Sequence, residues 1–323
     1  MVTRLCRAVF AGAALAAVSC GAAHKEDGNA GGPRDAAEGR DCIERGDFEG
    51  AVSIFEELVT GNPGDAELHY YLGLSRENLG DAAKAEAEYG RAIELDGTLL
   101  EARSNLGLLL LDKGEVAKAE KQLKACVDLD PEDADSHYNL GLAVDAAGRI
   151  EEAAMELTRA SELAPEDPAP YLALAEIAER GKKMDEALAF YDKALTAAPG
   201  DPAAALGKAQ LLIEMEKPDE AAAALEAIPS MEGADEAALA TAGMLYAKME
   251  RGDEAIEAYR AAIAKDAAFP MAHVLLANAL ARKEKFDEAR AEFEAFLKLV
   301  PEGEEADAAK KGLAACLAKI EKK

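Results

Sequence analysis

The chain has no tryptophan, only five cysteines, and 5% aromatic residues among its 323 residues. Basic residues are also scarce, because 36 lysines and arginines face 63 aspartates and glutamates, giving a formal net charge of −27 at pH 7. Such an excess of negative charge opposes binding to nucleic acid and electrostatic docking on anionic lipid. It favours a neutral or basic partner; the alternative is that the charge only keeps an alanine-rich chain soluble.

Sequence motifs that would carry catalysis are missing as well. The chain has no nucleophile elbow, no glycine-rich loop after a strand, and no HExxH or CxxC motif. Carboxylates are so plentiful that pairs of them carry no specificity. We therefore expect no enzymatic activity, no cofactor and no small-molecule substrate.

The cysteines do not form a pattern typical of a disulfide framework. Cys6 and Cys20 lie near the start of the chain, and Cys42, Cys126 and Cys316 are widely separated. We expect the last three to be small buried apolar side chains.

What the sequence does contain is a period of 34 residues. One alanine follows the same helix-turn phrase in every period and marks it: Ala51, Ala85, Ala119, Ala153, Ala187, Ala221, Ala255 and Ala289. A fixed period of this length predicts a stack of small helical units without a single globular core. The repeats begin near Gly32, Ala66, Leu100, Ala134, Pro168, Pro202, Glu236 and Pro270.

The third repeat shows how one unit is built. Gly114 ends a first helix, since the residue after a helix often adopts a left-handed backbone conformation that glycine allows and side chains disfavour. Ala119, Leu123 and Cys126 then recur at spacings of four and three, which predicts the buried stripe of a second helix. Asp130-Pro131 ends that helix.

Small residues recur at place eight of the repeats, counted from each first residue, and large ones at place twenty-four. Place eight holds Gly39, Gly73, Gly107, Gly141, Ala175, Ala209, Gly243 and Ala277. Place twenty-four holds Phe55, Tyr89, Leu123, Leu157, Tyr191, Leu225, Tyr259 and Phe293. The pattern predicts that the two helices of each repeat approach closely at the small residue.

These residues resemble the tetratricopeptide repeat family, which has a leucine-glycine pair in its first helix, an alanine and an aromatic in its second, and a late proline. Leu72-Gly73, Leu106-Gly107 and Leu140-Gly141 match that pair. The resemblance implies an all-α, right-handed superhelical solenoid of about eight helix-turn-helix units over residues 32–303. Residues 304–323 read as a capping helix. The sixth repeat departs most, with Lys208 at place seven and an irregular ending, and predicts a bend or looser packing.

The first residues read as a targeting segment. Residues 1–19 have a basic start and a short apolar stretch, predicting a signal peptide, and Cys20 follows small residues. This resembles the lipobox of bacterial lipoproteins, with Ala17 where leucine is usual, and implies lipidation of Cys20. Residues 20–31 then read as a flexible tether. The resemblance implies an outer-membrane anchor facing the periplasm; the alternative is an ordinary export signal and secretion to the periplasm.

Three histidines share place four: His69, His137 and His273. Whole repeats separate them, so they cannot converge on one metal ion, and we expect no metal site. They are interpreted as partial substitutes for the large aromatic that the family has at this place.

Asn105 and Asn139 hold place six of consecutive repeats, on the side of the first helix expected to line the inner groove. A side-chain amide can hydrogen-bond a peptide backbone without reading its sequence, and family members use such asparagines in this way. The alternative is a solvated polar residue of the repeat pattern. The predicted peptide-binding groove also includes Tyr70, Tyr138, Leu74, Leu108 and Leu142.

The sequence thus predicts a non-catalytic scaffold of the bacterial envelope that binds a protein segment in this groove. One alternative is an assembly lipoprotein for an outer-membrane pilus or secretion machine, resembling the pilotins. A second is a structural envelope spacer without specific binding, and a third is a hydrolase or transferase hidden in the repeats.

Overall fold

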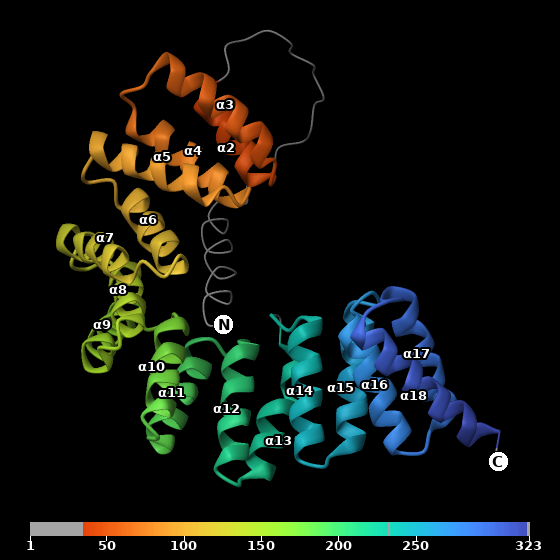
Figure 1. The fold of residues 1–323 in the computed structure, drawn as a ribbon. Helices are drawn as coiled ribbons and strands as arrows, with labels where there is room; N and C mark the ends of the chain where they lie inside the picture. Colours follow the sequence, from red (N-terminus) through yellow and green to blue (C-terminus); the bar gives the residue numbers. More distant parts are fainter. Residues whose placement is uncertain (1–34, 232, 322–323) are drawn as a thin grey trace. The chain divides into compact units, whose positions relative to one another are not determined.

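A computed structural model describes residues 35–231 and 233–321. These residues form seventeen α-helices and one short 3-10 helix, and none of them lies in a strand (Figure 1). The prediction of an all-α fold made of paired helices is therefore confirmed. The predicted signal peptide, Cys20 and the tether lie outside the described residues.

The chain divides between Leu163 and Ala164 into two compact halves. In the N-terminal half, each helix packs against the next one, and the first helices α2, α4, α6 and α8 also contact their neighbours in that series. Its helices are α2 (Ala36–Glu44), α3 (Phe48–Gly61), α4 (Ala66–Asn78), α5 (Ala82–Leu95), α6 (Leu100–Asp112), α7 (Val116–Leu129), α8 (Ala134–Ala146) and α9 (Ile150–Leu163).

The C-terminal half repeats the arrangement. The first helices α12, α14 and α16 lie beside one another, and the second helix of each repeat packs against the first helix of the same repeat. Its helices are α10 (Ala169–Arg180), α11 (Met184–Ala197), α12 (Pro202–Glu214), α13 (Pro218–Glu226), α14 (Glu236–Lys248), α15 (Gly252–Lys265), α16 (Pro270–Arg282), α17 (Phe286–Leu299) and α18 (Glu304–Ile320).

Aspartates begin many of these helices. Asp65 accepts hydrogen bonds from the backbone N–H groups of Glu67 and Leu68 at the start of α4, and Asp133 does the same for Ser136 in α8. The first N–H groups of a helix have no partner within it, so such a side chain stabilises the helix by about 1 kcal/mol. The acidic composition therefore also defines where helices start.

The turn inside each repeat contains a residue with positive φ at place fifteen. In the N-terminal half this residue is always glycine: Gly46, Gly80, Gly114 and Gly148, at φ from 74° to 79°. In the C-terminal half it is Lys182, Glu216, Glu250 and Glu284, at φ from 56° to 62°. A side chain in this region costs about 1–2 kcal/mol, so the turns of the C-terminal half are strained where those of the other half are not.

Each aromatic ring at place twenty-four lies against one glycine. In three repeats the glycine is at place eight of the same repeat: a Cβ on Gly39, Gly73 or Gly243 would come within 2.4–2.8 Å of Phe55, Tyr89 or Tyr259. This confirms the predicted close approach of the two helices.

Two of the repeats with an aromatic ring at place twenty-four have alanine at place eight, and in these the ring packs against a glycine of the next helix. Tyr191 lies against Gly207 of α12, and Phe293 against Gly312 of α18, with a Cβ on the glycine 2.4 and 2.5 Å from the ring. Sequence reasoning missed these two glycines, because they stand at other places of the repeat pattern.

The sixth repeat departs from the others, as its sequence suggested. Its second helix α13 has 9 residues where the other second helices have 14, and a 3-10 turn, Ile228–Ser230, follows it. Ile228 is fully buried in the core of the C-terminal half. The 3-10 turn therefore continues the apolar packing where the shortened helix ends.

The last helix, α18, packs on α17 and α16. Ala306, Ala309 and Cys316 form its buried side. Cys42 and Cys126 are buried too, as predicted, and burial raises the pKa of the Cys126 thiol to about 11. Burial therefore holds the Cys126 thiol in its protonated, unreactive form.

Candidate functional site: the first-helix face of the N-terminal half

The predicted site residues lie on one side of three neighbouring helices, α4, α6 and α8. Places three, seven, eight and ten of these helices are buried between the two helices of a repeat, whereas places two, five, six and nine fall on the opposite stripe at helical spacing. We call this surface the acidic face. Its residues are Glu67, Tyr70, Tyr71, Leu74, Glu101, Ser104, Asn105, Leu108, Asp135, Tyr138, Asn139 and Leu142.

The aromatic part of the acidic face is a cluster around Tyr70. Its ring centroid lies 5.0 Å from that of Tyr71 and 6.1 Å from that of Tyr89. Tyr71 in turn stacks on Phe55 at 5.4 Å and carries the guanidinium of Arg40 at 5.6 Å from its ring. Tyr70 and Tyr71 are only partly buried, so this cluster offers apolar area with a hydroxyl at its edge.

The hydroxyl of Tyr70 is held protonated. Burial raises its pKa to about 12, with the negative charge of nearby Glu101 acting in the same direction. At neutral pH the group is therefore a hydrogen-bond donor as well as an acceptor.

Asn105 lies next to this cluster. Its Nδ2 donates to the hydroxyl of Tyr89 over 3.5 Å, and that hydroxyl donates to the carboxylate of Glu77 over 2.7 Å. The Asn105 side chain is partly exposed and also interacts with the hydroxyl of Tyr70. Because its bond to Tyr89 is long, the amide can still reach a bound segment.

Asn139 differs from Asn105. Its side chain is only 1% exposed, and its Nδ2 donates to the hydroxyl oxygen of Ser104 on α6 over 3.1 Å. The amide thus links two repeats, which the sequence did not predict. Its Oδ1 is buried and has no hydrogen-bond partner among the described residues. A buried acceptor of this kind costs about 1–3 kcal/mol unless something donates to it.

The remaining predicted residues lie on the same face. Leu74, Leu108 and Leu142 are partly buried, and Tyr138 is 8% exposed. Together they form an apolar row along α4, α6 and α8 beside the asparagines. The structure brings all seven predicted groove residues onto one face, and peptide binding by them stays a prediction.

The charged residues at places two, five, six and nine of α4, α6 and α8 are all acidic. Glu67, Glu101 and Asp135 occupy place two of the three helices, and no lysine or arginine occupies places two, five, six or nine. The arginines of α4 and α6 point elsewhere. Arg76 pairs with Glu88 and with Glu56, the latter at 2.8 Å.

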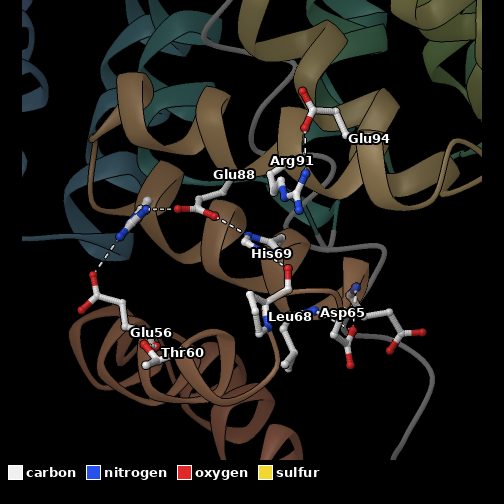
Figure 2. Close-up of polar contacts among 11 residues, drawn as sticks. Glu56, Thr60, Asp65, Leu68, His69, Glu88, Arg91 and Glu94 are labelled. Atoms are coloured by element: carbon white, nitrogen blue, oxygen red, sulfur yellow. Dashed lines mark hydrogen bonds and ion pairs between the residues drawn. The ribbon is translucent and has the colours of Figure 1, made fainter.

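The three histidines of place four have a defined structural role. His69 Nδ1 lies 2.6 Å from Glu88 Oε2 in the second helix of its own repeat (Figure 2). Its Nε2 lies 3.3 Å from the carbonyl oxygen of Pro63 in the preceding turn. His137 makes the same contacts with Glu156 at 2.7 Å and Pro131 at 3.1 Å. Each ring therefore bridges two repeats.

His273 forms the third bridge, with Glu292 at 2.7 Å and the carbonyl oxygen of Ala267 at 3.1 Å. The third repeat replaces the histidine with Arg103, which donates to Gln122 and to the carbonyl oxygen of Gly97 at 3.0 and 2.9 Å. The sequence carried a usable signal, since a glutamate follows each of these three histidines by 19 residues and no other repeat has glutamate at place twenty-three. The interpretation as substitutes for an aromatic missed this polar bridge.

Residues 35–231 and 233–321 contain no group of histidine, cysteine, aspartate or glutamate side chains placed to hold a metal ion. Within the same residues, no helix combines the length and the apolar composition that a membrane span needs.

Two profiles of known protein families match the repeats. A family profile described as "Protein kinase G tetratricopeptide repeat" matches residues 91–273, and a second, "Tetratricopeptide repeat", matches residues 36–98. The chain belongs to the tetratricopeptide repeat family. No curated protein matches the chain over its sequence.

Solved structures show the same fold. Yeast Tom70 is 23% identical with a TM-score of 0.64, over 85% of this chain and 59% of its own. A tetratricopeptide repeat protein from Parabacteroides merdae is 18% identical with a TM-score of 0.57, over 76% of this chain and 96% of its own. PilF from Pseudomonas aeruginosa is 23% identical with a TM-score of 0.51, over 60% of this chain and 89% of its own. At these identities the likeness establishes the fold, and the chain spans only about three fifths of Tom70.

Proposed function

We propose that this tetratricopeptide repeat protein is a non-catalytic scaffold of the bacterial envelope that binds a neutral or basic protein segment on its acidic face. The observation that carries the proposal is the partly exposed amide of Asn105 beside an apolar row with acidic side chains at one edge. A side-chain amide has both a donor and an acceptor, so the backbone of a bound segment would pair with it.

The other groups of the face supply complementary contacts. Leu74, Leu108 and Leu142 would cover apolar side chains of the segment, and Glu67 and Glu101 would attract its lysines or arginines. Charges at the edge of an interface mainly raise the association rate and select the partner. Binding should therefore weaken as salt rises.

The test is affinity capture from solubilised membranes, with the bound proteins identified by mass spectrometry. Wild type is compared with a variant carrying Glu67→Gln, Glu101→Gln and Asp135→Asn. The control removes as many charges from second helices, through the changes Glu94→Gln, Glu151→Gln and Glu162→Gln. We expect the amount of a captured partner to fall about tenfold with the variant of the acidic face and to stay unchanged with the control.

A second variant, Asn105→Ala with Asn139→Ala, tests the amides. The proposal is refuted if every captured protein binds both the charge variant and this amide variant with unchanged affinity. Helical circular dichroism of each variant confirms that the fold is retained.

The envelope location is a separate part of the proposal. Lipidation of Cys20 would anchor the chain to the outer membrane, with the repeats in the periplasm. Labelling with a fatty-acid analogue in wild type and Cys20→Ser tests it, since equal labelling of both proteins rules out that site.

A further inference from the structure

The C-terminal half carries a corresponding surface with different chemistry. Places two, six, nine and thirteen of α12, α14 and α16 form one stripe on each helix, and these three helices lie beside one another (Figure 1). We call this surface the apolar face. Its residues are Ala203, Gly207, Gln210, Glu214, Ala237, Thr241, Met244, Lys248, Met271, Leu275, Asn278 and Arg282.

Two methionines are the most exposed large apolar side chains of this face. Met244 on α14 is 43% exposed, and Met271 on α16 is 45% exposed. Leu206, Val274 and Leu275 lie partly buried beside them and continue the apolar area. Methionine side chains are flexible and polarizable, and they suit surfaces that fit apolar partners of varied shape.

Charge on the apolar face is opposite in sign to that on the acidic face. Over these places the apolar face has one acidic residue, Glu214, and two basic ones, Lys248 and Arg282. The corresponding places of α4, α6 and α8 have four acidic residues and no basic one. Lys248 and Arg282 are exposed at the last turns of α14 and α16; Lys248 follows Met244 by one helical turn, whereas Arg282 lies at the opposite end of its helix from Met271.

From this charge complementarity we infer that the apolar face binds a partner segment that has an apolar stripe followed by acidic side chains. The apolar stripe covers Met244 and Met271, and the carboxylates meet Lys248 and Arg282. The two halves of one chain then select segments of opposite charge. This inference does not depend on the acidic face having a partner.

The test uses the full chain and two fluorescent peptides. Both peptides carry leucines at helical spacing; one ends in aspartates and glutamates and the other in lysines. Fluorescence anisotropy gives the dissociation constant of each. The measurement is made in a background carrying Glu67→Gln, Glu101→Gln and Asp135→Asn, so that the acidic face does not contribute. With the apolar face unchanged, we expect this protein to bind the acidic-tailed peptide at least about tenfold more tightly than the lysine-tailed peptide.

The decisive variant is Lys248→Glu with Arg282→Glu. It should reverse the preference between the two peptides. The matched control is Lys265→Glu with Lys298→Glu, because these lysines are also exposed and also lie in last turns, but of the second helices α15 and α17. Basic residues there make the same favourable interaction with the helix dipole, so the control separates a dipole role from a docking role.

Removal of the apolar contact provides a second measurement. Met244→Ser with Met271→Ser should weaken the acidic-tailed peptide by about tenfold or more, with helical circular dichroism unchanged. Failure of wild type to bind the acidic-tailed peptide at about 100 µM overturns the inference, and so does an equal effect of the lysine control.

Sedimentation adds a third outcome: a wild-type dimer that Met244→Ser with Met271→Ser dissociates would mean that a second copy of this chain covers the face.

Discussion

The two halves of the chain repeat one helical plan with different details. The N-terminal half has glycine at every positive-φ turn position of its repeats and acidic side chains across its first helices. The C-terminal half has lysine or glutamate at the corresponding turn positions and exposed methionines on its face. The buried stripe stays the same in both. The comparison teaches that packing between repeats tolerates large changes in turn strain and surface charge, which leaves the faces free to select different partners.

The packing rule should hold equally in both halves. Gly73→Ala and Gly207→Ala should each destabilise the protein by about 3 kcal/mol, because a Cβ there would lie 2.8 Å from the ring of Tyr89 and 2.4 Å from that of Tyr191. Gly90→Ala is the matched control, since its Cβ meets nothing within 4 Å and it lies in helix α5. It should stabilise by about 0.5–1 kcal/mol.

Urea unfolding followed by circular dichroism measures all three variants. A lowered midpoint for Gly90→Ala, or an unchanged one for Gly207→Ala, would contradict the rule that each ring needs one glycine.

The histidine bridges should also contribute in both halves. Glu156→Ala and Glu292→Ala each leave a buried ring nitrogen without its acceptor, so each should cost about 2 kcal/mol in the free energy of unfolding. Glu151→Ala, an exposed change in the same helix as Glu156, should cost less than about 0.5 kcal/mol. Equal midpoints for Glu151→Ala and Glu156→Ala in thermal unfolding would show that the bridge is not needed.

Turn strain should distinguish the halves. Glu250→Gly or Glu284→Gly removes a side chain from a positive-φ position and should stabilise by about 1 kcal/mol, after the entropy cost of glycine. Gly148→Ala in the N-terminal half should destabilise by a similar amount. If differential scanning calorimetry shows the same sign for both kinds of change, the two sets of turns are equally relaxed and the contrast between the halves is wrong.

Much of the fold could be predicted from the sequence because the same local pattern occurs once in each of the eight repeats. The alanine of place twenty, the large residue of place twenty-four and the burial of Cys42 and Cys126 all follow from helix periodicity alone. The shortened helix of the sixth repeat was foreseen only as a departure, since several endings can fill the same apolar space.

Contacts between different repeats were harder to predict. The link from Asn139 to Ser104, the pairing of Tyr191 with Gly207 and the contact of His69 with the carbonyl oxygen of Pro63 depend on how far one helix is offset from the next. The sequence period gives the spacing of residues along the chain and not that offset. The glutamates that follow the histidines were visible, but only the structure shows that the side chains meet.

The acidic face is the central claim, and hydrogen exchange measured by mass spectrometry with a captured partner tests it most directly. Partner binding on that face should slow exchange of backbone amides in α4, α6 and α8, and the variant with Glu67→Gln, Glu101→Gln and Asp135→Asn should lose this protection. Protection confined to the second helices α5, α7 and α9, with those first helices unchanged, would contradict the account.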